Sequence, residues 1–171
     1  VQEKINETTG IKKMLMLDAI KVGKIHNIDY LSVGKTPPLM NQLKYKFYEK
    51  TVYSLLKKTI GIENGNFFPT AGAAISDEIN EFIHSVGINL IVGYGLTEST
   101  ATVSCLVPDQ YTIGSVGKIM PDVEVKIGEN NEILLRGKTI TKGYYKKAEA
   151  TAAVFTEDGW FRTGDAGYMK D

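Results

Sequence analysis

The chain has 171 residues, and its 20 basic and 20 acidic side chains give a formal net charge of +0. This balance argues against a duplex nucleic-acid binder, whose modules usually carry a basic excess. Cys105 is the only cysteine, which excludes an intrachain disulfide and a cysteine-based zinc site and fits a reducing compartment. No apolar stretch approaches the ~20 residues of a membrane-spanning helix. The polar first residues and the absence of an initial Met indicate a piece of a longer, cytoplasmic protein.

The first third of the chain is predicted to be helical. Apolar residues recur at helical spacing from Ile11 to Val22, and a second, longer helix runs toward the Gly61 that ends it. Lysines on one side of this second helix are typical of a solvated face, which we favour, or of a helix lying on a membrane surface. The opposite, apolar side is expected to carry Leu39, Leu43, Phe47, Val52, Leu55, Leu56 and Ile60.

The middle third alternates between strand and helix patterns. A strand is predicted at 66–68 and a buried one at 89–92. Between them, Ser76 is a plausible N-cap of a helix whose buried stripe is expected to contain Ile79, Phe82, Ile83 and Val86. Strand, helix and strand at this spacing indicate a βαβ unit of a parallel sheet.

The last third changes to a two-residue period, which is typical of half-exposed strands. Strands are predicted at 123–127 and from 133 to 135, with a turn between them, and a short helix at 148–154. Further strands are expected at 160–162 and 167–169. The pattern thus predicts an α/β part followed by a mostly β part, with the change near residue 108.

The densest cluster of candidate functional residues is the segment 93–100, Gly-Tyr-Gly-Leu-Thr-Glu-Ser-Thr, directly after the apolar strand. Open α/β sheets bind ligands at the carboxyl ends of their strands. A tyrosine ring can stack on a base, a threonine hydroxyl can donate to a phosphate, and a carboxylate can hold Mg²⁺. Taken by itself, the segment can equally be a glycine-rich turn with a helix cap.

Two further segments support a nucleotide site. The small-residue loop 70–76 lies between a predicted strand and a predicted helix, where its backbone can pass along the edge of a flat ligand. The segment 159–165 ends in Asp165, whose carboxylate can accept hydrogen bonds from two ribose hydroxyls. Each segment is a weak signal alone, but the three in this order favour nucleotide binding.

In these motifs the sequence resembles the adenylate-forming superfamily, which includes acyl-CoA synthetases, luciferases and peptide-synthetase adenylation domains. The loop 70–75 is similar to the family's adenine-contacting loop, and 94–98 matches its Tyr-Gly-x-Thr-Glu motif. Residues 132–145 resemble its Gly-Glu-Leu…Gly…Gly-Tyr segment, and 161–165 its Tyr-Arg-Thr-Gly-Asp motif. The resemblance extends from about Phe67 onward, and the helical lead-in is similar to that of long-chain fatty acyl-CoA synthetases.

The resemblance implies the fold class and the division of the chain. The class is α/β, with a parallel-sheet subdomain followed by a small β-rich, barrel-like subdomain, as part of the large N-terminal domain of an acyl-CoA synthetase. Residues 1–108 would be the second half of the α/β AMP-binding subdomain. Residues 109–171 would be the β-rich subdomain, truncated at its C-terminal end.

The same resemblance implies which residues bind the nucleoside. Tyr94 would stack on the adenine, while Gly72 and Ala73 would line the edge of the base. Gly95 would belong to the same nucleotide-binding loop as Tyr94. Asp165 would bind the ribose hydroxyls.

The catalytic residues implied by the family are Thr97, which would contact the α-phosphate, and Glu98, which would ligate Mg²⁺. The reaction would be attack of a substrate carboxylate on the α-phosphorus of ATP, giving an acyl-adenylate and pyrophosphate. The sulfur of coenzyme A would then displace AMP. Such chemistry depends on positioning and charge neutralisation more than on covalent bonds to the protein.

Several features depart from the family pattern. Ala71 stands where many members have Gly, Phe161 replaces the usual Tyr, and Asn131 stands where Gly commonly precedes Glu132. Neither the phosphate loop with its Lys nor the ribose-binding Arg, the hinge and the small C-terminal domain with its catalytic Lys lies within these residues. The resemblance therefore implies that neither half-reaction runs efficiently on this chain alone.

The leading functional hypothesis is ligation of a fatty acid to coenzyme A, with ATP, fatty acid and coenzyme A as partners and no nucleic acid. A long-chain acid is favoured by the helical lead-in and by the small residues of 92–95, which leave room for an acyl tunnel. The alternatives are an acyl-adenylating enzyme that delivers to a carrier protein, a nucleotide-binding module without catalysis, and a purely structural fragment. Peripheral association at the inner membrane face and the oligomeric state are left open.

The remaining candidate residues are expected to have structural roles. His26 and His84 lack a second ligand at metal spacing and are expected at the surface or on the side of a helix. Cys105 is expected to be a small core residue. Residues 114–118 lack the four-residue gap of a phosphate loop. Core, turn or barrel positions are expected for Arg136, Gly137, Gly143, Tyr144, Trp160 and Phe161.

Overall fold

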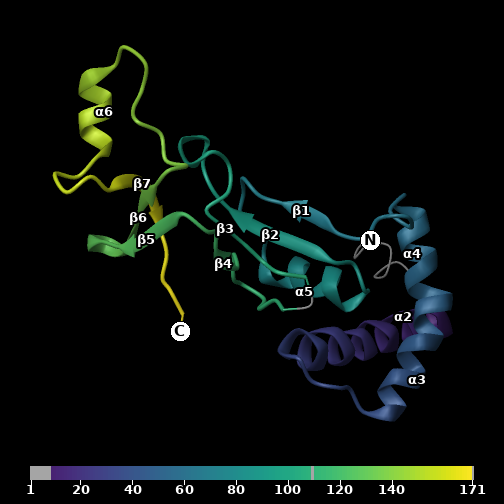
Figure 1. Cartoon of the computed structure of the whole chain (residues 1–171). Coiled ribbons are helices and arrows are strands. Elements are labelled where there is room, and N and C mark those ends of the chain that lie inside the picture. Colours follow the sequence, from purple (N-terminus) through teal and green to yellow (C-terminus); the bar gives the residue numbers. More distant parts are fainter. Residues whose placement is uncertain (1–8, 109, 171) are drawn as a thin grey trace. The chain divides into compact units, whose positions relative to one another are not determined.

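The computed structural model describes residues 9–108 and 110–170, which form two compact units (Figure 1). The first unit comprises the described residues up to Val92 and those between Leu106 and Gly117. The second comprises Gly93–Cys105 and the described residues from Lys118 onward. The units are therefore not divided at residue 108, because Tyr94, Leu96 and Val103 pack into the core of the second unit. The assignment of family subdomains to these parts stays a prediction.

Both predicted helices of the first unit are present, and each contains a π-helical turn. In Figure 1 the second helix is one continuous run. The elements in chain order are α2 (Gly10–Gly23), the π turn η1 (Lys24–Tyr30), the 3-10 turn η2 (Leu31–Val33), α3 (Leu39–Tyr48), the π turn η3 (Glu49–Tyr53) and α4 (Ser54–Thr59).

The apolar side predicted for the second helix is only partly packed: Val52 and Leu56 contact the core, whereas its other members are exposed. Its packed face is aromatic, since Tyr48 is 6% and Tyr53 0% exposed, whereas Leu43 is 56% and Phe47 58% exposed. The tyrosines can be buried because their hydroxyls find acceptors: Tyr53 Oη donates to the Ala19 carbonyl at 2.5 Å. The packed residues Tyr45, Tyr48, Val52 and Leu56 recur every three or four positions across the π turn η3.

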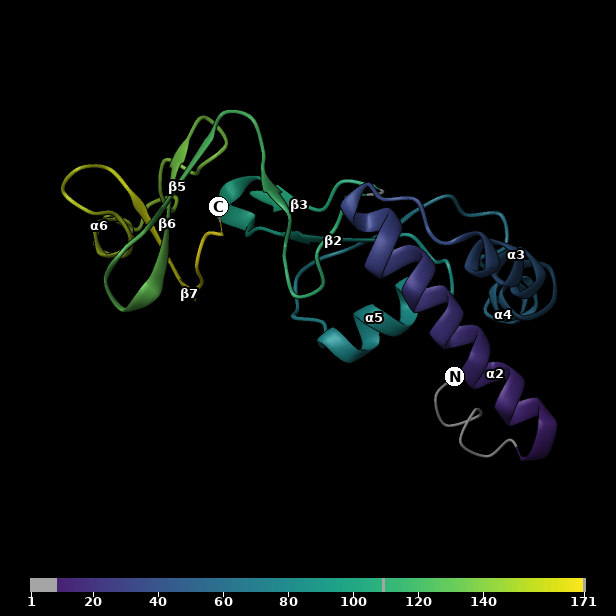
Figure 2. The same ribbon diagram turned by 90° about the horizontal axis from the view of Figure 1, so that it is seen from below.

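The predicted βαβ unit is confirmed. Strand β1 (Phe68–Thr70) pairs in parallel with β2 (Leu90–Tyr94), and α5 (Asp77–Ser85) connects them. Ser76 caps α5, because its side chain accepts a hydrogen bond from the Ile79 backbone N–H at 3.3 Å. Figure 2 shows α2 and α5 on the same side of the β1–β2 pair.

The buried face of α5 is more polar than its sequence predicts. Asn80 is 2%, His84 3% and Ser85 1% exposed, whereas Ile79 is 46% exposed. Of the two positions expected for His84, the side of a helix is confirmed by its place on α5, and the surface is wrong. Its ring stacks on Tyr111 with centroids 3.8 Å apart, so an aromatic partner in the loop after residue 106 makes the burial favourable.

The second unit is built from short antiparallel strands. The end of β2 pairs with β3 (Ser104–Cys105), which pairs with β4 (Lys118–Ile119). A three-stranded sheet follows, in the order β5-β6-β7. Its elements are β5 (Val123–Ile127), the 3-10 turn η5 (Glu129–Asn131), β6 (Glu132–Gly137), α6 (Ala148–Val154) and β7 (Phe161–Ala166).

This sheet confirms the predicted hairpin, with Val125 opposite Leu135, and the predicted helix at 148–154. The core positions expected for Trp160 and Phe161 are confirmed at 8% and 3% exposure. Residues 167–169 form no strand, so that prediction is wrong. Cys105 is only half-buried. The mixed α/β class is confirmed: a parallel strand pair and a separate small sheet are both present.

Candidate functional site

The loop 95–101 after β2 is held in one conformation by close backbone packing. A Cβ atom on Gly95 would lie 1.6 Å from the Ala101 carbonyl oxygen, so only glycine fits there. Ser99 is 0% exposed, and its hydroxyl accepts a hydrogen bond from Leu96 N at 2.9 Å and donates to Leu96 O at 3.0 Å. The chain leaves the turn through Thr100 with a left-handed φ of 54°. This loop therefore presents the adjacent residues 97 and 98 from a fixed backbone.

Thr97 and Glu98 lie in the 3-10 turn η4 (Thr97–Ser99) within this loop. Thr97 is exposed and Glu98 is half-buried. The Glu98 carboxylate accepts a hydrogen bond from Tyr144 Oη at 2.8 Å. This bond raises the pKa of the Tyr144 hydroxyl above its ordinary value, because the bonded carboxylate disfavours a phenolate.

The second predicted carboxylate is also paired with a tyrosine. Tyr94 Oη donates to Asp165 Oδ2 at 2.7 Å. The pKa of the Tyr94 hydroxyl is raised, first by burial and then by this hydrogen bond. Two residues that are 71 positions apart, which the motifs assign to the base and to the ribose, are thus brought into contact.

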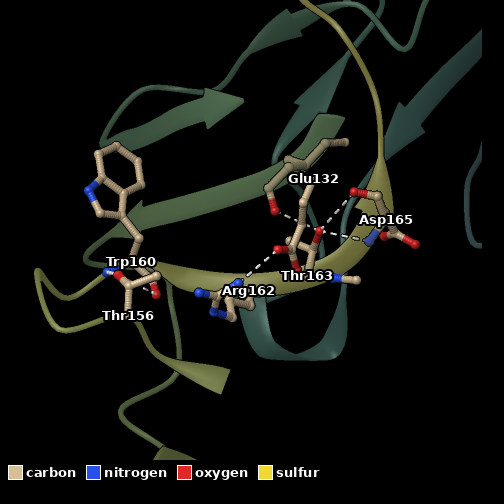
Figure 3. A network of polar contacts seen from close by, with 8 residues as sticks. Glu132, Thr156, Trp160, Arg162, Thr163 and Asp165 are labelled. Atoms are coloured by element: carbon tan, nitrogen blue, oxygen red, sulfur yellow. Dashed lines mark hydrogen bonds and ion pairs between the residues drawn. The ribbon is translucent and has the colours of Figure 1, made fainter. Parts of the chain in front are cut away.

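The bend of β7 that precedes Asp165 is fixed by Glu132, at the start of β6 (Figure 3). Glu132 Oε1 accepts a hydrogen bond from the Gly164 backbone N–H at 3.1 Å, and Oε2 one from Arg162 at 3.2 Å. The Thr163 hydroxyl accepts a bond from Asp165 N at 3.0 Å. Together these bonds set the direction in which the chain presents Asp165, whose side chain is exposed.

Gly72 and Ala73 lie in the first unit, in the exposed loop between β1 and α5. Gly72 has a φ of +90°, and nothing lies within 4 Å of the position that its Cβ would take. The loop therefore offers open backbone, which is what contact with a flat ligand edge needs. Its role beside the base stays a prediction.

Sequence reasoning missed three residues that shape the site: Ser99, Tyr144 and Glu132. Ser99 bonds only to the Leu96 backbone, and Leu-x-x-Ser is not a capping-box pattern, so no sequence signal pointed to it. Glu132 was noted only as part of a family motif. Tyr144 was interpreted as structural, and no spacing rule connects it with Glu98, which is 46 residues away.

The carboxylates near the loop 95–101 suit a divalent cation that is bound jointly by one side chain and a nucleotide. They do not form a metal site made of protein side chains alone. Among residues 9–108 and 110–170 there is no group of three or more His, Cys, Asp or Glu side chains that could hold a metal ion. Mg²⁺ is usually bound by one or two carboxylates together with substrate phosphates. Glu98 alone therefore fits this kind of binding.

In the same described residues, no helix is long and apolar enough to cross a membrane.

Comparisons with known proteins identify the family. The profile described as "AMP-binding enzyme" matches residues 15–145. The long-chain-fatty-acid–CoA ligase FadD15 of Mycobacterium bovis is 33% identical over 135 residues, which are 79% of this chain and 22% of that protein. A 2-succinylbenzoate–CoA ligase of Listeria monocytogenes is 37% identical over 128 residues, which are 70% of this chain and 27% of that protein.

A solved structure gives the same family. The o-succinylbenzoate CoA synthetase of Bacillus subtilis, in complex with its acyl-adenylate intermediate, matches with a TM-score of 0.56 and 26% sequence identity. The match covers 62% of this chain and 24% of that one. The chain thus spans only about a quarter of the length of these relatives.

Proposed function

Because this chain belongs to the AMP-binding enzyme family, we propose that it supplies part of the ATP site of an acid–CoA ligase that works through an acyl-adenylate. The observation that carries this proposal is the rigid loop 95–101, which presents Thr97 and Glu98 beside each other after a buried strand. The contact between Tyr94 and Asp165 in the same unit supports it, because it joins the residues assigned to base and ribose.

The proposed roles follow from the chemistry of each side chain. The Tyr94 ring stacks on the adenine, with Gly72 and Ala73 at the edge of the base. Asp165 accepts hydrogen bonds from the ribose hydroxyls, and its bond to Tyr94 keeps the carboxylate oriented for them. Gly95 keeps the loop backbone close to the nucleotide.

The reacting atoms lie at the α-phosphate. The Thr97 hydroxyl donates a hydrogen bond to an α-phosphate oxygen, which stabilises charge that develops as the substrate carboxylate attacks phosphorus and pyrophosphate leaves. Glu98 would hold Mg²⁺, which supplies charge neutralisation at the phosphates when bound. In the second half-reaction the sulfur of coenzyme A attacks the acyl carbonyl, and AMP leaves.

We propose a fatty acid, and more narrowly a long-chain one, as the acid substrate of the full-length protein. The proposal rests on relatives that are named long-chain-fatty-acid–CoA ligases in Mycobacterium bovis and yeast. A relative with another acid in its name, 2-succinylbenzoate, defines the competing substrate class. The test must therefore compare both classes of acid in one assay.

The experiment is carboxylate-dependent ATP–pyrophosphate exchange by the full-length protein that contains these residues. The acids are short, medium and long fatty acids and 2-succinylbenzoate, and Glu98→Ala is the control. We expect exchange only with long fatty acids, and a loss of about a hundredfold or more in the variant. Exchange with 2-succinylbenzoate alone would overturn the substrate class. Exchange without transfer to coenzyme A would favour delivery to a carrier protein, and no exchange with any acid would leave a nucleotide-binding module.

We further propose that the helical run 39–59 lies on an anionic membrane surface. Several of its apolar side chains face solvent, with Leu39 72%, Met40 68% and Leu55 65% exposed, whereas Val52 and Leu56 pack on the core. Lys46 and Lys50 are exposed beside them. Exposed apolar side chains flanked by lysines suit the interface of a membrane with anionic headgroups.

Vesicle binding tests this surface. The full-length protein is expected to co-sediment with vesicles that contain anionic phospholipid and to lose this binding in a Leu43→Glu variant. Lys12→Glu changes charge elsewhere in the first unit and is expected to keep most of the binding. Equal partition of wild type and Leu43→Glu would mean that another part of the protein covers this face.

A further inference from the structure

We propose that Tyr144 is a positioning residue that orients the Glu98 carboxylate for the metal–nucleotide complex. The inference rests on the proposed function, because it concerns the residue that would hold Mg²⁺. It adds a residue from outside the loop 95–101 to the ATP site. The feature that points to it is the hydrogen bond from Tyr144 Oη to Glu98 Oε1, at 2.8 Å.

In this proposal the two oxygens of the Glu98 carboxylate have different partners. Oε1 accepts the hydroxyl of Tyr144, and we assign the cation to the other oxygen, Oε2. Carboxylates that bind metals are commonly held by a second hydrogen-bonded group, which fixes their orientation. A neutral donor does this without cancelling the negative charge that attracts the cation. A lysine or arginine in the same place would cancel it.

The position of Tyr144 is itself fixed by the preceding segment. Thr141 N donates to the Glu98 carbonyl oxygen at 2.6 Å, and the Thr100 hydroxyl donates to the Thr139 carbonyl at 2.7 Å. The Tyr144 backbone N–H donates to the Thr151 hydroxyl at 2.9 Å. Residues 139–144 are therefore attached to the loop of Glu98 at the backbone as well as through the phenol.

Gly143 allows this segment to pass close to α6. Its φ is +134°, and a Cβ there would lie 2.5 Å from Thr151 Cγ2. The close approach brings the next residue, Tyr144, to Glu98. Tyr145 provides a natural comparison, because its side chain is 84% exposed and its ring lies beside the Lys146 amine instead.

The test measures ATP binding by the full-length protein, by equilibrium dialysis, with Mg²⁺ and with EDTA. For Tyr144→Phe we expect about a tenfold loss of affinity in Mg²⁺ and no change in EDTA, since second contacts to metal ligands commonly contribute this much. Tyr145→Phe is the matched control and is expected to bind like wild type in both conditions. A merely structural role would weaken binding equally with Mg²⁺ and with EDTA, which would overturn the proposal.

A double-mutant cycle with Glu98→Gln shows whether Tyr144 acts through Glu98. If it does, adding Tyr144→Phe to Glu98→Gln causes no further loss of Mg²⁺-dependent affinity. Independent losses would overturn the inference, as would tighter Mg²⁺-dependent binding in Tyr144→Phe, which would make the tyrosine a competitor of the cation. Exchange by wild type tests the proposed function separately, so a wild type that binds Mg²⁺–ATP through this pair but exchanges with no acid would refute only the ligase.

Discussion

The two units use the same chemical pair, a tyrosine hydroxyl on a carboxylate, in different ways. In the first unit Tyr48 Oη donates to Asp18 at 2.6 Å, and this bond, assisted by burial, raises the pKa of Tyr48 to about 12. The pair joins α2 to α3. In the second unit Tyr94 binds the carboxylate of Asp165, near the end of β7, and Tyr144 binds that of Glu98, in the loop 95–101, at 2.7 and 2.8 Å.

The difference lies in the backbone around each pair. Asp18 sits in the middle of a regular helix, so its carbonyl and amide are used by the helix and its side chain closes a helix–helix contact. Glu98 lies in the loop 95–101, whose backbone leaves no room for a Cβ on Gly95, and its half-buried carboxylate accepts the Tyr144 hydroxyl. The same hydrogen bond therefore stabilises packing in one unit and orients a candidate ligand in the other.

Among the changes that test the different roles of the two units, Gly95→Ala is expected to have the largest effect on activity. The new Cβ would overlap the Ala101 carbonyl, so the loop must shift and carry Thr97 and Glu98 with it. A misplacement of this size is expected to lower ATP–pyrophosphate exchange by about a hundredfold.

Gly61→Ala is the matched control for that variant, because Gly61 has a φ of +75° with nothing within 4 Å of its Cβ position. It should cost about 1 kcal/mol of stability through backbone strain and leave exchange unchanged. If both variants lost exchange alike, the loop 95–101 would have no special role.

Lowering the pH is expected to have a smaller effect, which acts on the stability of the first unit. Burial lowers the pKa of His84 to about 4 from its ordinary 6.5. Between pH 4 and 6.5 the unfolded chain binds a proton at His84 that the folded chain does not, so acid favours unfolding. The stability associated with neutral His84 is therefore complete above about pH 6.5 and is lost as the pH falls toward 4. The expected loss between pH 7.5 and 4.5 is about 2.5 kcal/mol.

Denaturant unfolding at several pH values measures this loss, with His84→Gln as the control that removes the titrating group. The difference in stability between wild type and variant should change with pH in this window and stay constant above it. A constant difference at all pH values would show that His84 is charged or solvated in the folded protein.

The smallest effects are expected from removing one hydroxyl in each unit. Tyr48→Phe should lower the free energy of unfolding by about 1 kcal/mol and leave ATP affinity unchanged. Tyr94→Phe should weaken ATP by about fivefold but not 2′,3′-dideoxy-ATP, because the lost hydroxyl acts through the carboxylate assigned to the ribose. Equal weakening of both nucleotides would show that Tyr94 acts on the base alone.

The elements that the sequence predicts well are those with a local cause. Ser76 caps its helix, and residues 123–127 alternate as a strand. The aromatic face of the second helix was missed, because the prediction followed apolar residues such as Leu43 and Phe47, whereas the most deeply buried side chains are tyrosines whose hydroxyls find acceptors. The burial of His84 on the side of α5 was not predicted, because it depends on Tyr111, in a loop far along the chain.

The site shows the same division between local and distant causes. Thr97, Glu98 and Asp165 were found as motif residues, each on its own segment. The partners that orient them could not be found in this way, because Tyr144 is 46 residues from Glu98 and Tyr94 is 71 from Asp165. Tyr94, at the end of β2, meets Asp165 of β7, and backbone bonds attach residues 139–144 to the loop of Glu98.

The long separation between Glu98 and Tyr144 has a consequence for biosynthesis. A ribosome that adds about 5–20 residues per second makes the loop 95–101 some seconds before the segment 139–144, which is hydrogen-bonded to it. During that interval the βαβ unit and its helices can already fold, whereas Glu98 has no tyrosine to hold it. The nascent protein therefore acquires its scaffold first, and the carboxylate is locked into place only by residues that leave the ribosome later.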